Sequence, residues 1–155
     1  MGLDMYLTKK TYISRYNDDI EITIKKNGVD MEIDTERIKG VVEEVGYWRK
    51  FNALHNWFVK NCQDGTDDCD EYIVEQDKID ELITLLKEID SAYSKSEKKG
   101  IGKAQKLLPT QDGFFFGHTQ YDEYYFDSIK NTLSLLEKLK SENNSLSEFY
   151  YRASW

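Results

Sequence analysis

Residues 20–33 read IEITIKKNGVDMEI, and this stretch predicts a β-hairpin. Isoleucines at positions 20, 22 and 24 alternate with polar residues, which is the period of a half-buried strand. Apolar residues alternate again at positions 29, 31 and 33, on the other side of Asn27-Gly28. Because Asn and Gly tolerate the positive φ angles of a tight turn, we expect Asn27-Gly28 to join two antiparallel strands.

Strands are also predicted at both ends of the chain. Apolar and polar residues alternate over residues 3–8, and they alternate again over residues 149–152. A short apolar run, YIV at 72–74, is a further strand candidate in the middle of the chain. The sheet is therefore expected to contain segments that lie far apart in the sequence.

Helical spacing occurs in three segments. Tyr47, Phe51, Leu54 and Phe58 recur every three or four residues and predict a helix over roughly residues 43–61. A second helix, capped by Asp77, is predicted from an apolar stripe that consists of Ile79, Leu82, Ile83, Leu86 and Ile89. A third is expected over residues 122–140, whereas residues 94–102, SKSEKKGIG, are typical of a loop.

These elements indicate an α+β fold. We expect a small antiparallel sheet, including the N-terminal hairpin, packed against about three helices. Since the chain has 155 residues and no evident linker, residues 1–155 are expected to form a single domain.

The charge of the chain excludes some classes of partner more strongly than others. It contains 29 acidic and 21 basic residues, for a formal net charge of −8, so general nucleic-acid binding is not expected. No apolar run has membrane-spanning length, and no secretory signal is recognisable. We therefore expect a cytoplasmic protein, in which Cys62 and Cys69 are reduced thiols.

The helix predicted over 43–61 offers a candidate ligand site. Trp48, Asn52 and His55 are spaced by four and three residues, and would form a second face beside the core stripe. Arg49 and Lys50 would stand at the start of this helix, where cations can contact phosphate oxygens. The alternative is that Trp48 packs on the sheet and that one hydrogen bond satisfies His55.

An aromatic segment at 107–125 offers a second set of contacts. Three Phe residues lie between Gly113 and Gly117, and strand-like alternation would bury Phe114 and Phe116 while exposing Phe115. An exposed ring at this position would stack on a planar base, with Tyr121 adding a hydrogen bond. A strand buried on both faces is the alternative.

The acidic loop at 64–71 has five carboxylates in eight residues. Such a loop can wrap a Ca²⁺ or Mg²⁺ ion, but the spacing does not match the calcium-binding helix–loop–helix pattern, which favours a solvated loop. His55, Cys62, Cys69 and His118 also lack the paired spacing of a structural zinc site. We expect no metal and no cofactor.

Several motifs resemble a family of small accessory proteins encoded by tailed bacteriophages and prophages. They are GLDMYL at 2–7, EVGYWRK at 44–50, LLPT at 107–110, GFFFG at 113–117 and YDEYY at 121–125. The resemblance implies a phage protein that acts in the host cytoplasm. It also implies a role against bacterial immunity, either by sequestering a nucleotide signal or by blocking a defence protein.

The leading hypothesis is a binding protein, rather than an enzyme, that sequesters a small nucleotide-like ligand. Its expected ligand-binding residues are Trp48, Arg49, Lys50, Asn52, His55, Phe115 and Tyr121. A second hypothesis is a protein–protein inhibitor of a host defence enzyme, which would dock through an aromatic and acidic surface. A third is metal-dependent hydrolysis by the Asp64–Asp70 loop with His55, and a homo-oligomer is compatible with each.

Overall fold

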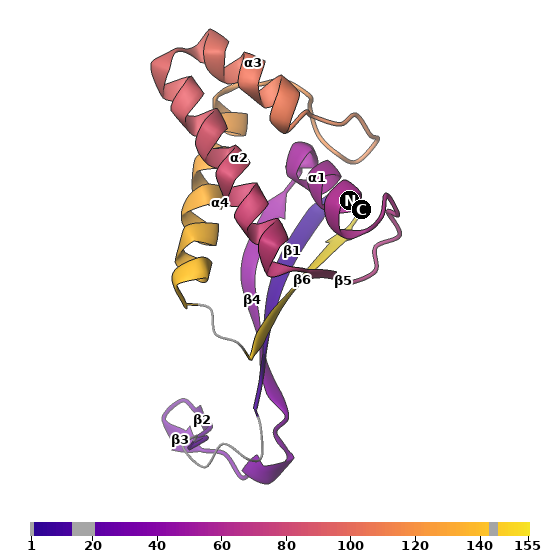
Figure 1. Ribbon diagram of the computed structural model, residues 1–155. Helices are drawn as coiled ribbons and strands as arrows, with labels where there is room; N and C mark the ends of the chain where they lie inside the picture. Colours follow the sequence, from indigo (N-terminus) through magenta and orange to yellow (C-terminus); the bar gives the residue numbers. More distant parts are fainter. Residues whose placement is uncertain (1, 14–20, 143–145) are drawn as a thin grey trace.

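The computed structural model describes residues 2–13, 21–142 and 146–155. Its main element is an antiparallel sheet of four strands in the order β4-β1-β6-β5. The strand bounds are Asp4–Tyr12 for β1, Gly40–Arg49 for β4, Tyr72–Val74 for β5 and Ser147–Ser154 for β6. The two central strands come from opposite ends of the chain, so the termini lie side by side (Figure 1). This is the expected α+β fold.

Alternation along the strands gives the sheet one buried face. Leu3, just before β1, and Met5 and Leu7 within it have fully buried side chains, and in β6 those of Phe149 and Tyr151 are buried as well. The intervening residues are half-buried or exposed. The predicted strands at 3–8, 72–74 and 149–152 are confirmed, because an alternating pattern buries one face against helices and leaves the other open.

Four helices of the described chain cover the buried face and one another. They are α1 (Asn52–Cys62), α2 (Gln76–Lys95), α3 (Glu97–Leu107) and α4 (Glu123–Glu142). Phe58 of α1 stacks on Tyr151 of β6, with ring centroids 4.0 Å apart. Helix α3 folds back along α2, as Figure 1 shows at the upper end of the molecule. Among the described residues, no helix combines the length and the apolar character needed to span a bilayer.

The helix predicted over 43–61 is wrong in its first half. Residues up to Arg49 belong to strand β4, and the helix begins only at Asn52. Trp48 pairs with Met5, and Tyr47 pairs with Tyr6, across the β1–β4 ladder. The four-residue spacing of Tyr47 and Phe51 is thus coincidental, because pairing with a distant strand overrides a local helical period.

Gly46 lies in β4 because the neighbouring indole needs its space. A Cβ at Gly46 would stand 2.7 Å from the Trp48 ring. A β-bulge next to this glycine shifts the register between Leu7 and Thr8. A residue that weakens a helix is here a strand residue that admits a large side chain.

The predicted turn at Asn27-Gly28 is confirmed, although the hairpin is short. Asn27 and Gly28 have φ angles of 53° and 80°, and they join β2 (Lys25–Lys26) to β3 (Val29–Asp30). Ile20, the first residue of the predicted pattern, lies outside the described residues. The hairpin is separate from the main sheet, and a short 3₁₀ turn (Thr35–Arg37) follows it.

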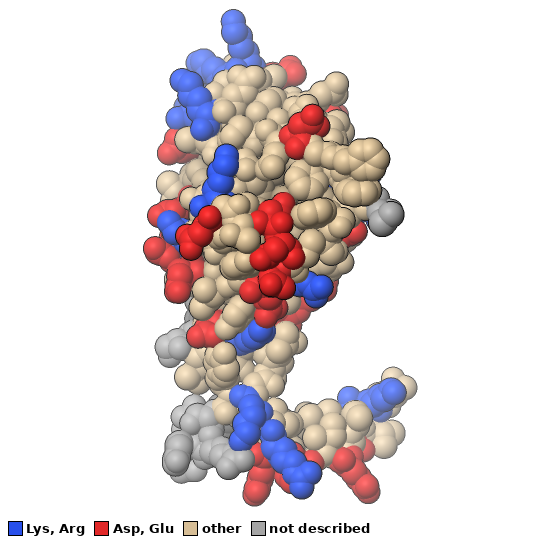
Figure 2. Space-filling view, turned by 90° about the vertical axis from the view of Figure 1, so that its right-hand side faces the viewer, with Lys and Arg blue, Asp and Glu red and all other residues tan. Residues whose placement is uncertain are grey.

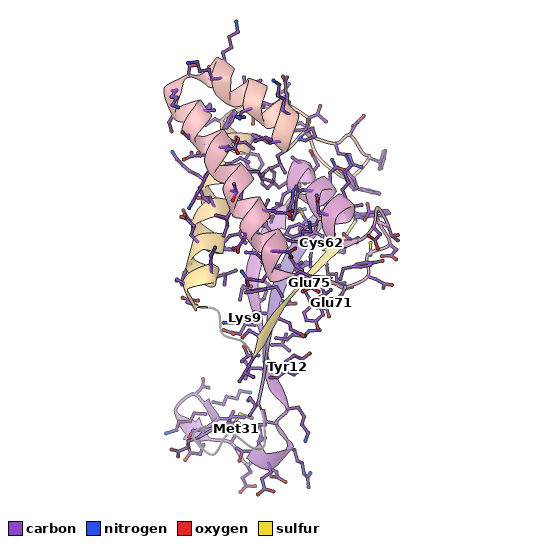
Figure 3. All side chains as sticks on the ribbon, viewed as in Figure 1. Lys9, Tyr12, Met31, Cys62, Glu71 and Glu75 are labelled. Carbon is purple, nitrogen blue, oxygen red and sulfur yellow. The ribbon has the colours of Figure 1, made fainter. Side chains whose placement is uncertain are left out.

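The alternation predicted for the hairpin holds in its first half, where Ile22 and Ile24 are half-buried, but not in its second half. Val29 is 69% exposed and Met31 is 43% exposed. Figure 3 shows Met31 on a projecting arm, well apart from the helices. The apolar residues at 29, 31 and 33 therefore do not belong to the hydrophobic core.

Two predictions concerning α2 and its neighbour need correction. The apolar stripe of α2 is buried as expected, but Asp77 is not the cap, since the helix begins at Gln76 after Glu75. The segment predicted as a loop, 94–102, instead contains the end of α2 and the start of α3. Ser96 separates the two helices and accepts a hydrogen bond from the Lys99 amide.

Gly100 explains why α3 forms despite its two glycines. A Cβ at Gly100 would stand 2.7 Å from atoms of Tyr93, so only glycine lets α3 approach α2 this closely. Packing against α2 compensates for the low helix propensity of the segment.

Candidate functional site

Asn52, the first residue of α1, is buried and holds the aromatic segment in place. Its amide nitrogen donates hydrogen bonds to the carbonyl oxygens of Phe116 and His118, at 3.0 and 2.9 Å. Its side-chain oxygen accepts a hydrogen bond of 2.9 Å from the Gln111 amide. These three bonds use most of the hydrogen-bonding capacity of the side chain, so Asn52 organises the fold of residues 111–118.

His55 is fully buried and is bonded at both ring nitrogens. Nδ1 lies 2.8 Å from the Tyr151 hydroxyl, and Nε2 lies 3.0 Å from a carboxylate oxygen of Asp67. The other oxygen of Asp67 accepts a hydrogen bond from the Trp155 indole at 3.1 Å. This chain of polar groups ties the acidic loop and the C-terminal strand to α1, and it leaves the imidazole no free nitrogen.

Trp48 lies in β4 and points towards the helices. Its indole nitrogen donates a hydrogen bond of 2.8 Å to the Thr132 hydroxyl on α4, and its side chain is buried. The second helical face predicted from Trp48, Asn52 and His55 therefore does not exist, because Trp48 precedes the helix. Moreover, residues 52–59 of α1 are all buried, so this helix has no solvated face along those residues.

Arg49 and Lys50 do not stand at the start of a helix, as the sequence predicted. Arg49 is the last residue of β4, and Lys50 has a positive φ of 55° where the chain turns towards α1. Both side chains are exposed. Arg49 lies opposite Asp4 in the β1–β4 ladder, on the sheet face that no described helix covers.

The aromatic segment is a turn rather than a strand, so its alternation is lost. Phe114 is 95% exposed, Phe115 is half-buried against the core, and Phe116 is buried. The prediction for Phe114 is therefore wrong, and so is the prediction that Phe115 is the exposed ring. Gly113 lets the Phe116 ring fold back, since a Cβ there would stand 2.6 Å from that ring.

Tyr121 also serves the fold of this segment. Its hydroxyl accepts a hydrogen bond of 3.1 Å from the Thr110 amide. Of the seven predicted ligand-binding residues, Lys50 and Asn52 line a common cavity, whose volume is about 10 Å³. A cavity of this size holds roughly one water molecule. Lys50 and Asn52 therefore do not enclose space for a nucleotide.

The acidic loop does not form a cation site with the other described residues. Within residues 2–13, 21–142 and 146–155, no group of three or more His, Cys, Asp or Glu side chains is arranged to hold a metal ion. Both cysteines are free thiols, and burial raises the pKa of Cys62 to about 12. Cys62 is the last residue of α1 and is half-buried (Figure 3). A protonated, buried thiol is a poor metal ligand and a poor nucleophile.

A concave site lies between α2 and α3, where residues of both helices line a groove. Its volume is about 710 Å³, within the range of small-molecule sites. Five lysines line it together with a glutamate and three small residues: Lys87, Lys95, Lys99, Lys103, Lys106, Glu88, Ser91, Ala92 and Gly102. We call it the lysine groove.

The lysine groove is strongly cationic within an acidic protein. Residues 95–106 contain five lysines and one glutamate, whereas the chain as a whole has a net charge of −8. In Figure 2, Lys and Arg side chains gather at the upper end of the molecule, where Figure 1 shows α3 and the end of α2, and also on the arm at the lower end. Asp and Glu side chains lie mainly across the middle and lower parts of the same view.

Lysines of the groove differ in whether a carboxylate neutralises them. Lys87 pairs with Glu137 at 2.7 Å, and Lys103 pairs with Glu88 at 2.9 Å. Across the part of the chain that the structure describes, no carboxylate lies within 4.0 Å of the ammonium groups of Lys95, Lys99 and Lys106. Like charges held along one groove without partners favour the binding of an anion.

The sequence contains a signal for this groove. The prediction of a loop at 94–102 prevented its recognition. Lys99, Lys103 and Lys106 are spaced by four and three residues, so they share one face if the segment is helical. The position of Lys87 and Lys95 across from that face depends on the antiparallel packing of α2 and α3. That packing cannot be inferred from spacing.

A second surface is the sheet face opposite the helices, which carries tyrosines and arginines. Tyr6 and Tyr47 lie side by side, with ring centroids 5.4 Å apart, and the Tyr47 hydroxyl donates a hydrogen bond to Asp4. This bond raises the pKa of Tyr47 above its ordinary value. Arg49 and Arg152 flank these rings in the ladder. We call this the tyrosine face.

Other contacts on the tyrosine face are made within the sheet. The ammonium group of Lys10 lies 3.9 Å above the ring of Tyr150, whose hydroxyl donates a hydrogen bond to Glu148. Tyr47 nevertheless remains 48% exposed. The face is open, but it is not hollowed by any cavity described for this protein.

Comparison with protein-family models, with curated proteins and with solved structures reveals no significant match. The resemblance to phage accessory proteins stays a prediction, and function must be inferred from the two surfaces themselves.

Proposed function

We propose that this protein binds a phosphate-bearing, nucleotide-like ligand in the lysine groove and acts by sequestering it. The observation that carries the proposal is a groove of about 710 Å³ with three lysines that have no carboxylate partner among the described residues, on a protein of net charge −8. Ammonium groups are point charges that donate hydrogen bonds to phosphate oxygens, and phosphate is the commonest multiply charged group of small biological ligands.

Sequestration rather than turnover follows from the side chains that line the groove. They include no histidine, cysteine or aspartate, and the single glutamate is paired with Lys103. The lysines and Ser91 of the groove are nucleophiles only when a neighbouring base activates them, and the lining offers no histidine or aspartate for this role. In the host cytoplasm, a phage protein of this kind would lower the free concentration of a nucleotide signal of bacterial immunity.

Isothermal titration calorimetry with ATP as the probe tests this proposal. The double variant Lys99→Ala, Lys106→Ala should bind ATP at least about tenfold more weakly than the parent, because each lost charged hydrogen bond weakens binding. Lys98→Ala is the matched control, since Lys98 lies on the same helix but does not line the groove. Absence of ATP binding by the parent at low salt, or equal losses in both variants, would contradict the proposal.

A second candidate function is the inhibition of a host defence enzyme through the tyrosine face. The observation that favours it is composition, because exposed tyrosine and arginine side chains are the residues that contribute most at protein interfaces. Tyr47 and Arg49 stand on this face with their side chains exposed. An open sheet face without a cavity suits a folded protein better than it suits a small molecule.

Protection of phage in infected cells distinguishes the two candidates. Sequestration predicts that the Lys99→Ala, Lys106→Ala variant loses protection while Tyr47→Ala, Arg49→Ala retains it. Docking through the tyrosine face predicts the reverse. Loss in both variants, with both proteins folded by circular dichroism, would mean that neither surface acts alone.

A further inference from the structure

The lysine groove offers no side chain on which a nucleobase could stack. None of its nine lining residues is aromatic, and Ser91 offers the one hydroxyl group among them. Base recognition in proteins normally uses stacking on rings and hydrogen bonds from amides or carboxylates. If the proposed function holds, the groove therefore contacts the anionic part of the ligand and leaves any base outside.

The lysines of α3 are arranged in a row along the helix rather than clustered at one place. Lys99, Lys103 and Lys106 are spaced by four and three residues, which extends over about 10 Å along the helix axis. Lys95 faces this row from the end of α2. A row of this length matches several consecutive phosphates better than it matches a single phosphate group.

Glu88 places a negative charge inside the same groove. Its carboxylate lies 2.9 Å from the ammonium group of Lys103, at the middle of the row. A phosphate that reaches Lys103 must either displace this carboxylate or accept repulsion from it. Only a ligand that gains contacts with Lys95, Lys99 and Lys106 at once can offset that cost, whereas a short anion cannot.

Gly102 leaves room in the groove along which the phosphate chain of a ligand can lie. A Cβ at this position would meet no heavy atom within 4 Å, although Gly102 lies on the groove side of α3. A side chain here would project into the space of the groove without a clash in the folded protein.

We propose that the lysine groove selects ligands by the length of their phosphate chain, an inference that rests on the proposed function. Glu88 sets the minimum chain length that binds well. The ligand class is a linear polyphosphate chain, free or as the tail of a nucleoside polyphosphate. The base contributes little to affinity. Glu88 acts as a specificity-determining residue, because it penalises short anions more than long ones.

Titrations of the parent protein with phosphate, pyrophosphate, tripolyphosphate, ATP and GTP test this proposal. Affinity should rise at least about tenfold from pyrophosphate to tripolyphosphate, which is the effect of adding charged contacts. Tripolyphosphate, ATP and GTP should bind within about threefold of one another, because the groove has no aromatic ring on which a base can stack. Gly102→Leu should weaken all of them by filling the groove.

Glu88→Gln separates this inference from the function on which it rests. It should strengthen pyrophosphate binding several-fold more than tripolyphosphate binding, and so reduce the discrimination between them. Glu97→Gln is the matched control, since it removes the same charge from the exposed first turn of α3, outside the groove lining.

The outcomes distinguish a failure of the proposed function from a failure of the selection by chain length alone. Lack of binding of every phosphate compound by the parent protein overturns both the proposed function and the selection by length. Tripolyphosphate binding with a preference for ATP over GTP above about tenfold overturns only the inference, because it requires base recognition. Equal effects of Glu88→Gln and Glu97→Gln overturn the role of Glu88. Tighter binding of a single-stranded oligonucleotide than of tripolyphosphate also overturns the ligand class.

Discussion

The cluster around His55 and the lysine groove use polar side chains in opposite ways. His55 and Asn52 are buried, and together they make five hydrogen bonds to fixed partners. Lys95, Lys99 and Lys106 line an open groove and have no carboxylate partner in the described chain. The first set contained predicted ligand-binding residues, and the second set was not recognised in the sequence.

This difference shows how a residue type misleads when its surroundings are unknown. Histidine and asparagine suggested a pocket because they are common in binding sites, but here their hydrogen-bonding capacity is used within the fold. The stretch SKSEKKGIG at 94–102 suggested a loop, but two packed helices hold its Lys95 and Lys99 along one groove. The two regions should therefore respond differently to mutation, and five variants rank that difference by its effect on stability.

The largest effect is expected for His55→Ala. The change leaves the buried Tyr151 hydroxyl without its partner and opens a cavity, so the free energy of unfolding should fall by about 3 kcal/mol or more. Urea unfolding measures this loss. His118→Ala is the control, because the His118 side chain is 52% exposed and its removal should cost under about 0.5 kcal/mol. Similar losses in the two variants would mean that the His55 contacts do not stabilise the fold.

Asn52→Ala should have the next largest effect, about 2 to 3 kcal/mol, because three hydrogen bonds to residues 111–118 are lost. The effect should be local as well as global. Hydrogen exchange of the Gln111 amide should accelerate more than that of amides in α2. Unchanged protection of Gln111 would show that its bond to Asn52 does not hold the segment.

Two glycines of α3 should respond with opposite signs. Gly100→Ala should destabilise the protein by about 1 to 3 kcal/mol, because its Cβ would stand 2.7 Å from Tyr93. Gly102→Ala should stabilise it by about 0.5 to 1 kcal/mol, since the new methyl group meets no atom and alanine favours the helix. Thermal unfolding of the two variants under one condition tests the sign. Destabilisation by both would mean that α3 does not pack on α2 as described.

The smallest effect on stability is expected for Lys106→Ala. The side chain is exposed and has no carboxylate partner within the described residues, so the free energy of unfolding should change by under about 0.5 kcal/mol. Binding of ATP should nevertheless weaken. A loss of stability comparable to that of Asn52→Ala would assign Lys106 to the fold rather than to a ligand.

Much of the fold can be predicted from local patterns. Alternation places Leu3, Met5 and Leu7 on the buried face of β1, and the apolar stripe of α2 is buried along its whole length. The turn at Asn27-Gly28 follows from the φ angles that these two residues tolerate. These features are set by neighbours a few residues apart, which is why the sequence by itself determines them.

Tertiary structure alone decided the elements whose local pattern was ambiguous. Trp48 belongs to a strand because it pairs with Met5, which lies 43 positions earlier in the numbering of the chain. Residues 97–107 form a helix because Gly100 lets them pack on Tyr93. Long-range pairing and packing add free energy that exceeds intrinsic propensities of a fraction of a kcal/mol per residue.

The same division holds for the candidate site. The lysines themselves, and their spacing on one segment, are written in the sequence at 95–106. The groove exists because α3 folds back antiparallel to α2 and brings Lys99 and Lys103 opposite Lys87 and Lys95. Composition thus determined the charge of the segment. Only the packing of two helices decided that this charge lines a common groove, because juxtaposition is a property of the folded chain and not of residue spacing.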